Sequence, residues 1–183
     1  RVLSRSMPPG VSEIDPNLVS VLLKYDPMAT SYEQLAGEVR ILLREAGAEE
    51  PARPARHTIA VRFGGEEGPD LDEVATRLGL TRQEFIAAHC ARPLRVLTTG
   101  FAPGFVYCGF HPDSLDLPRR TEVRRSVPAG AVLFAARQTA VAATAIPTGW
   151  HVIGRTGFRN FDPEADPPTR LREGDEVVFE AEP

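Results

Sequence analysis

The sequence predicts an α+β protein in which a small α/β N-terminal part precedes a β-barrel. Up to residue 92, strand-like runs alternate with amphipathic helical patterns. After residue 93, short strand-like runs are separated by turns rich in proline and glycine, and there is little helix. Closely spaced strands of this kind are typical of a sandwich or a barrel. We therefore divide the chain into an N-terminal part, residues 1–92, and a barrel, residues 93–183.

The N-terminal part begins with two predicted strands, residues 11–16 and 18–25, of which the second contains a continuous apolar run. An amphipathic helix follows and ends near Gly47. Its first turn can be capped by a hydroxyl side chain, that of Thr30 or Ser31, with an acidic or amide residue three positions later completing a capping box. The apolar stripe of this helix is expected to pack on the two strands.

A linker rich in proline, alanine and arginine is predicted over residues 49–56, and a strand over residues 57–63. Two short helices come next. Asp70 is predicted to cap the first helix, and Thr81 the second, since Glu84 completes a capping box with Thr81.

The barrel strands are predicted from apolar runs that are bounded by turn residues. These runs are residues 94–98, 131–135, 139–145, 151–153 and 176–180.

The most unusual stretch of the chain, residues 98–109, holds three glycines, a proline and three aromatic residues. Pro103 and Gly104 suit the two central positions of a type II turn, because proline presets φ and glycine accepts the positive φ that follows. The aromatic residues, which could hold the loop in place, are Phe101, Phe105 and Tyr107. The stretch is either a hairpin turn clamped by its own aromatics or a loop whose backbone amides face a ligand.

Composition excludes several classes of protein. The net charge of −4 gives no electrostatic reason to expect binding to nucleic acid or to a membrane. Lys24 is the only lysine and is not followed by serine or threonine, so a phosphate-binding P-loop is impossible. Two cysteines make no disulfide framework, and no long apolar segment is present, so we expect a cytoplasmic protein.

Four arginines within seven residues, Arg119, Arg120, Arg124 and Arg125, are the first candidates for chemistry. Arginine binds carboxylate and phosphate groups through two parallel hydrogen bonds, so two of them in a cleft would bind an anion. The alternative is a solvated surface, which we prefer for at least two of the four because Glu122 lies among them.

Other residues are candidates for ligand binding, each with an alternative structural role. Gln138 and Thr139 either line a pocket or end a strand. Trp150 is either a core residue or a ligand platform, and Arg155, followed by Thr156, is the better functional candidate.

Histidine and cysteine residues are weaker candidates for catalysis or metal binding. His89 lies on a predicted apolar helix face, which favours a buried structural group, but its titration range makes it the best general acid–base candidate. Cys108 and His111 have the spacing of half a metal site without a second half, so we expect no metal.

A series of motifs in this order resembles the family of the 5-oxoprolinase B component, also called allophanate hydrolase subunit 1, the carboxyltransferase C/D domain or the KipI sensor-kinase-inhibitor domain. The motifs are Gly100-Phe101-Ala102-Pro103-Gly104-Phe105-Val106-Tyr107, Leu117-Pro118-Arg119-Arg120, Val127-Pro128-Ala129-Gly130, Gln138-Thr139, Gly149-Trp150, Ile153-Gly154-Arg155-Thr156, Phe161-Asp162-Pro163 and Gly174-Asp175. Upstream, Tyr25-Asp26-Pro27, Phe63-Gly64-Gly65, Gly68-Pro69-Asp70-Leu71 and His89 are also similar, so the resemblance covers nearly the whole chain from about Pro9.

The resemblance implies a cyclophilin-like barrel and an N-terminal domain whose usual first strand and helix are missing. It implies ATP-dependent opening of 5-oxo-L-proline to L-glutamate by a complex with the A and C components of 5-oxoprolinase, with ATP as the co-substrate. The implied catalytic residues are His89, Arg119, Arg120 and Arg155. The implied substrate-binding residues are Gly100, Phe101, Pro103, Gly104, Phe105, Tyr107, Gln138, Thr139, Gly149, Trp150 and Thr156.

The chain departs from the family pattern at residues 107–111, 136–140 and 146–150. Glycines are lost there, where backbone would approach a ligand. Two alternatives therefore stay open: a KipI-like inhibitor that binds a sensor histidine kinase, or a carboxyltransferase component of a urea-carboxylase-type enzyme that takes biotin from another chain.

Overall fold

The computed structural model describes residues 2–17, 20–46 and 54–182. The chain forms two compact units, Arg1–Arg53 and Pro54–Pro183, which are described separately. This division does not coincide with the predicted boundary between residues 92 and 93, because the strand at residues 56–63 is part of the barrel. The predicted linker falls largely on residues 47–53, which lie outside the described residues.

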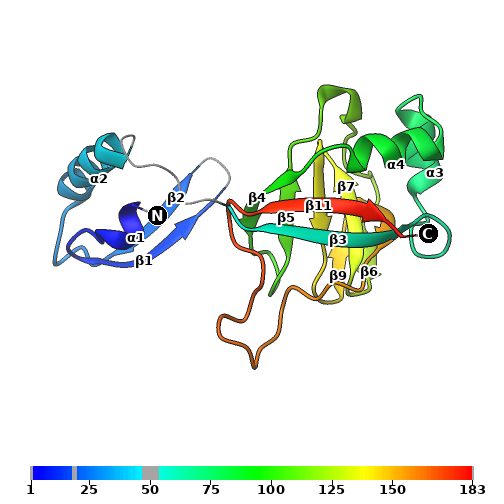
Figure 1. Cartoon of the computed structure of the whole chain (residues 1–183). Coiled ribbons are helices and arrows are strands. Elements are labelled where there is room, and N and C mark those ends of the chain that lie inside the picture. The colour runs from blue at the N-terminus through cyan, green and yellow to red at the C-terminus, as the bar shows by residue number, and fades with distance from the viewer. Residues whose placement is uncertain (1, 18–19, 47–53, 183) are drawn as a thin grey trace. The chain divides into compact units, whose positions relative to one another are not determined.

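The described part of the first unit contains a two-stranded antiparallel sheet and two helices (Figure 1). Its elements are α1 (Val2–Arg5), β1 (Val11–Pro16), β2 (Val21–Tyr25) and α2 (Tyr32–Ala46). Ser31 caps α2 as predicted: the Gln34 amide donates to Ser31 Oγ at 3.2 Å, and the Ser31 amide donates to Gln34 Oε1 at 3.3 Å. Helix α1 was not predicted; its Leu3 is buried, like Leu35 of α2.

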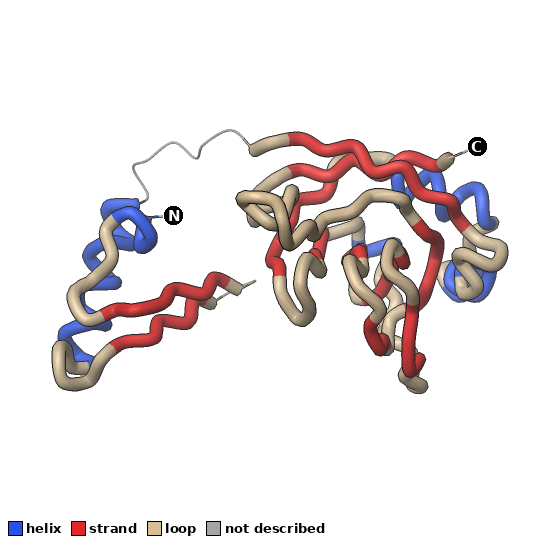
Figure 2. Tube along the Cα trace, turned by 90° about the horizontal axis from the view of Figure 1, so that it is seen from below, coloured by secondary structure: helices blue, strands red, loops and turns tan. Residues whose placement is uncertain are grey.

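The second unit is a closed barrel of seven strands in the order β10-β3-β11-β4-β5-β8-β7, so the predicted α+β fold with a β-barrel is confirmed. The strands are β3 (Arg56–Phe63), β4 (Leu94–Thr99), β5 (Val106–Gly109), β7 (Ala131–Ala135), β8 (Gln138–Val141), β10 (His151–Arg155) and β11 (Glu176–Ala181). Strands β3 and β11 are parallel and the other neighbours are antiparallel. Figure 2 shows this unit turned by 90° from Figure 1.

Helices α3 (Leu71–Arg77) and α4 (Arg82–Cys90) pack on each other (Figure 1). Helix α3 lies beside β10, and α4 lies beside β11. The predicted capping box at Thr81 and Glu84 is present. Asp70 occupies the N-cap position of α3 as predicted, but its side chain accepts no hydrogen bond from the helix and binds two arginines instead.

Apolar side chains pack on both faces of the barrel wall. The interior cluster includes Ile59, Phe134 and Phe179. The outer cluster includes Phe105, Leu133 and Trp150, and lies beside a second small sheet made of β6 (Arg124–Val127) and β9 (Ile146–Thr148). A short 3-10 helix, η1 (Asp113–Leu115), precedes that sheet. The wall between β5 and β10 is therefore packed on two sides.

Candidate functional site

Four aromatic side chains form a continuous row that we call the aromatic ladder: Phe101, Phe105, Tyr107 and Trp150. Successive ring centroids are 5.5, 4.8 and 5.7 Å apart. The Arg119 guanidinium lies over the Trp150 ring, 5.6 Å from its centroid. The ladder runs from buried to exposed, since Trp150 is 6% and Phe101 69% exposed. Burial raises the pKa of the Tyr107 hydroxyl.

The loop at the exposed end of the ladder is held in one conformation. The Phe105 amide donates to the Ala102 carbonyl at 3.0 Å, which closes the turn predicted at Pro103 and Gly104, and Gly104 has φ +70°. A Cβ at Gly104 would lie 2.5 Å from Phe161 Cβ, so only glycine fits there. The loop is fixed by close contact with the chain around residues 160–161, where Asn160 Nδ2 also donates to the Gly104 carbonyl at 2.9 Å.

Asp70 is a buried carboxylate that joins three segments of the chain. Its Oδ1 accepts hydrogen bonds from Arg120 Nη1, at 3.1 Å, and from Arg124 Nη2, and its Oδ2 accepts from the Val152 amide at 2.7 Å. Asp70 is only 3% exposed. Arg120 also reaches Gly149, whose carbonyl accepts from the Arg120 amide at 2.8 Å. Two of the four predicted anion-binding arginines are thus bound to a carboxylate of the chain itself.

A cleft of about 350 Å³ opens beside this carboxylate. Its lining residues come from four segments of the barrel unit and are Glu66, Glu67, Pro69, Arg124, Ser126, Val127, Pro128, Ala131, Val152 and Arg155. Val127, Ala131 and Val152 also belong to the outer apolar cluster, so the cleft adjoins the packing around Trp150. Arg62 donates to Glu67 and, together with the weaker influence of Arg155, holds the pKa of Glu67 below its usual value.

Two histidines lie inside the barrel. His89 Nε2 and His111 Nε2 each lie 2.8 Å from Thr139 Oγ1, so one hydroxyl bridges both rings. Desolvation, with a contribution from His111, lowers the pKa of His89 well below 6.5. Desolvation, with contributions from Arg92 and Arg137, lowers the pKa of His111 to about 4. Both rings are neutral at pH 7, and both are fully buried.

The structure brings most of the predicted site residues together on the outer face and separates a few. Two groups of predicted residues lie around the outer cluster and the cleft. The first is the loop with the aromatic ladder, and the second is Arg119, Arg120, Gly149 and Arg155. His89 and Thr139 lie inside the barrel instead. Gln138 is half-buried and pairs with Gly109, and Thr156 Oγ1 accepts from the Phe158 amide at 3.0 Å.

Sequence reasoning missed the acidic members of this region. Asp70 has the position of a helix cap, and nothing in the sequence distinguishes that use from pairing with distant arginines. Glu66 and Glu67 lie in a polar turn after a strand, where charged residues are ordinary. Their proximity to Arg155 depends on the pairing of β3 with β10, which no local pattern specifies.

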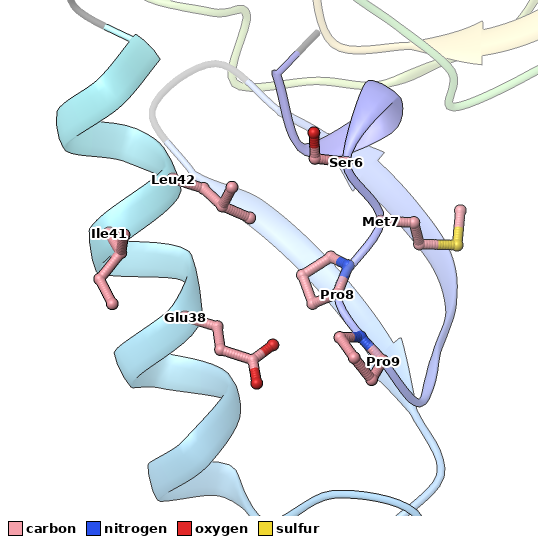
Figure 3. Close-up of a pocket in the computed structure, with 7 residues that line it drawn as sticks. All are labelled: Ser6, Met7, Pro8, Pro9, Glu38, Ile41 and Leu42. Carbon is pink, nitrogen blue, oxygen red and sulfur yellow. The ribbon is translucent and has the colours of Figure 1, made fainter.

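The first unit contains a separate hollow of about 300 Å³ between α2 and the segment after α1. Figure 3 shows Leu42 and Glu38 extending from α2 toward Pro8 and Pro9. The lining is mainly apolar, with one carboxylate. None of the predicted site residues lies in this hollow.

Among the described residues, no group of three or more histidine, cysteine, aspartate or glutamate side chains is placed to hold a metal ion. No helix in the described part of the chain is long and apolar enough to span a membrane.

Sequence comparison identifies relatives for nearly the whole chain. The family model described as carboxyltransferase domain, subdomain C and D, matches residues 1–171. The B component of 5-oxoprolinase from Bacillus subtilis is 35% identical over 181 residues, which cover 93% of this chain and 75% of that protein. The Escherichia coli O157:H7 protein of the same name is 45% identical over 121 residues, 66% of this chain and 56% of that protein.

Solved structures agree in fold. The crystal structure of TTHA0988 superposes with a TM-score of 0.82 at 35% identity, covering 100% of this chain but 35% of that one. The conserved uncharacterized protein PH0987 from Pyrococcus horikoshii has a TM-score of 0.66 at 36% identity, covering 98% of this chain and 82% of that one. Kluyveromyces lactis urea carboxylase, at 16% identity, has a TM-score of 0.75 over 100% of this chain and 19% of that one, a likeness of fold alone.

The matched part of this chain therefore corresponds to between about half and three quarters of the curated relatives and to a third of the TTHA0988 chain. The family match extends over more than nine tenths of the sequence and includes both units. With the motifs around the aromatic ladder and the cleft in place, the chain belongs to the family of the carboxyltransferase domain, subdomains C and D, which includes the B component of 5-oxoprolinase.

Proposed function

We propose that this chain is the B component of an ATP-dependent 5-oxoprolinase complex, which hydrolyses 5-oxo-L-proline to L-glutamate in the cytoplasm. Supporting observations are the curated relatives, which carry the name of this 5-oxoprolinase component at 35% and 45% identity. The structural observation behind the proposal is that motif residues from distant segments lie together around one outer face of the barrel.

The chemistry requires stabilisation of negative charge. A lactam is a poor electrophile, and phosphorylation of its carbonyl oxygen by ATP would make ring opening feasible. Charge that develops in the transition state is stabilised by preorganised donors in a site from which water is excluded. Arg155 and the backbone amides of Phe101, Ala102 and Gly104 are the groups this chain offers, because those of Gly100 and Phe105 already donate within the turn. Arg120 is a weaker candidate, because its guanidinium is already bound to Asp70.

The A and C components of 5-oxoprolinase are the proposed partners, and the chain alone is expected to be inactive. This chain has no P-loop, because its only lysine, Lys24, is not followed by serine or threonine, and we propose that a partner component binds ATP. The histidine-kinase inhibitor and the biotin-dependent carboxyltransferase stay as alternative predictions.

The test is reconstitution. The chain is mixed with the A and C components, and release of L-glutamate from 5-oxo-L-proline is measured with and without ATP. We expect turnover only with ATP and all components, and loss of nearly all activity in Arg155→Ala. The matched control is Arg95→Ala, which changes an exposed arginine of β4 that does not line the cleft. No turnover from a complete, folded complex would refute the proposal.

A further inference from the structure

The cleft beside Asp70 has an unusual balance of charge. Four charged side chains line it, and two of them already have partners: Arg124 is bound to Asp70, and Glu67 to Arg62. Neither Arg155 nor Glu66 forms an ion pair with any described residue of the chain. One unpaired cation and one unpaired carboxylate therefore face the same small space.

We propose that this cleft binds a small organic monocarboxylate that also carries a hydrogen-bond donor, with Arg155 binding the carboxylate and Glu66 accepting from the donor. The inference rests on the proposed function for the identity of the ligand, 5-oxo-L-proline. It adds the place on this chain where that substrate binds, and it assigns ligand contacts to Glu66 and Ser126.

Arg155 is placed to bind a carboxylate. It lies at the end of β10, paired with Ala131 of β7 and Arg62 of β3, so its backbone is fixed by the barrel on both sides. A guanidinium that has no internal carboxylate partner can form two parallel hydrogen bonds with a ligand carboxylate. The neighbouring Ser126 hydroxyl offers a further donor to a ligand carbonyl.

The rest of the cleft suits a compact ring. Pro69, Val127, Pro128, Ala131 and Val152 provide apolar walls, and Asp70 holds the Val152 amide and Arg124 in place from behind. A site that combines apolar walls with a few fixed polar groups is typical of small-molecule recognition. The methylene groups of a five-membered ring would pack on these walls.

Size and charge separate this ligand from ATP. The volume of about 350 Å³ is near the lower end of the range of about 300–1,000 Å³ that is usual for small-molecule sites. A nucleoside triphosphate brings about four negative charges, while Glu66 and Glu67 offset the two arginines of the cleft. The nucleotide therefore binds elsewhere in the complex.

The experiment measures binding to the full chain by calorimetry, without its partners. We expect 5-oxo-L-proline to bind and ATP neither to bind in the cleft nor to compete. Pyrrolidin-2-one, which lacks the carboxylate, should bind at least about tenfold more weakly, because a charge-assisted pair is lost. Arg155→Ala should weaken the binding of 5-oxo-L-proline to the same extent. Arg155→Lys should keep part of the affinity, and Arg95→Ala should keep all of it.

Glu66 is tested with a second ligand pair. N-methyl-5-oxoproline lacks the N–H donor and should bind more weakly than 5-oxo-L-proline to the wild-type chain. In Glu66→Ala the two ligands should bind equally, because the acceptor is gone. A difference that persists in Glu66→Ala removes Glu66 from the site.

The outcomes distinguish this inference from the proposed function. If the reconstituted complex releases glutamate but Arg155→Ala binds 5-oxo-L-proline within twofold of wild type, the cleft assignment is wrong and the proposed function stands. If the chain binds 5-oxo-L-proline through Arg155 but the complete complex releases no glutamate, the cleft assignment stands and the function is wrong. Absence of binding to both the chain and the complex overturns the cleft assignment.

Discussion

The inner and outer faces of the barrel wall use neighbouring residues of the same strands in different ways. Thr139 and Cys108 lie opposite each other on β8 and β5 and are fully buried, and Thr139 binds two neutral histidines. Gln138, one residue earlier, pairs with Gly109 and is only half-buried. Because side chains alternate across a strand, adjacent motif residues serve opposite faces. A conspicuous motif therefore mixes structural residues with candidate ligand contacts.

The outer face differs from the interior in charge as well as in access. It carries Arg119, Arg124 and Arg155 within reach of solvent, whereas the two histidines described in the interior are neutral at pH 7. We therefore expect substitutions of buried polar groups to lower stability strongly and substitutions of exposed residues on the outer face to change it little. Urea unfolding of the barrel tests that contrast, with the fluorescence of the single tryptophan, Trp150, as the signal.

The largest effect is expected from Thr139→Val. The change removes the hydroxyl shared by His89 and His111 and leaves two buried ring nitrogens without a partner, at about 2 kcal/mol each. The free energy of unfolding should fall by about 4 kcal/mol. Thr139→Ser keeps the hydroxyl and should lose about 1 kcal/mol, for the missing methyl group. Equal losses in the two variants would show that the histidine bridge contributes nothing.

Asp70→Asn should destabilise the barrel by about 3 kcal/mol, because it leaves two partly buried guanidinium groups without their carboxylate. The matched control is Asp72→Asn, two residues away, which breaks an exposed ion pair with Arg82 and should cost less than about 1 kcal/mol. If Asp72→Asn costs as much as Asp70→Asn, burial does not determine the importance of this carboxylate.

Acid should destabilise the protein through the interior histidines. The folded protein resists protonation of His111, whose pKa is lowered from 6.5 to about 4, whereas the unfolded chain accepts the proton near pH 6.5. The contribution of His111 to stability should therefore be constant above pH 6.5 and fall as the pH decreases toward 4, by about 1.4 kcal/mol per pH unit. Urea titrations at several pH values measure the slope.

His111→Gln provides the comparison for the acid effect. Glutamine keeps a donor for Thr139 but takes no proton in this range. The fall in stability between pH 6.5 and 4 should be shallower in this variant, and His89 and His151, whose pKa values are also lowered by burial, contribute to what remains. A slope identical to that of wild type would show that His111 does not contribute to the acid effect.

The smallest effect is expected on the outer face. Arg119→Ala removes an exposed cation from the Trp150 ring and should cost about 0.5 to 1 kcal/mol of stability. It should also change the Trp150 emission of the folded protein. Arg125→Ala, which alters an exposed arginine of β6, should leave both quantities unchanged. An unchanged emission in Arg119→Ala would mean that the contact does not form in solution.

Local signals in the sequence predicted local structure well. The Ser31 and Thr81 caps, the turn at Pro103 and Gly104, and strand β7 depend on interactions within a few residues and are confirmed. Strands β5, β6 and β9 were missed. Two of them are only four residues long and the third has three residues, including Pro147, so their apolar periodicity is too short to recognise.

The arrangement of the candidate site depends on contacts between distant segments, which local sequence patterns do not predict. Asp70 meets Arg120 and Arg124 across 50 and 54 residues, and nothing in either segment specifies the other. The placement of His89 inside the barrel follows from α4 packing on β11, again a distant segment. The resemblance to a family supplied the set of candidate site residues. It did not distinguish those that lie inside the barrel from those on its outer face.

The parallel pairing of β3 with β11 affects how this chain can acquire its fold. Arg56 and Glu176 form an ion pair across 120 residues, and β11 lies between β3 and β4 in the barrel. Until residues 176–181 leave the ribosome, β3 and β4 each have an open edge that can pair with other chains. Nonlocal closure of this kind slows folding. We expect the barrel to close only after β11 has been synthesised, and nascent chains to need protection from aggregation until then.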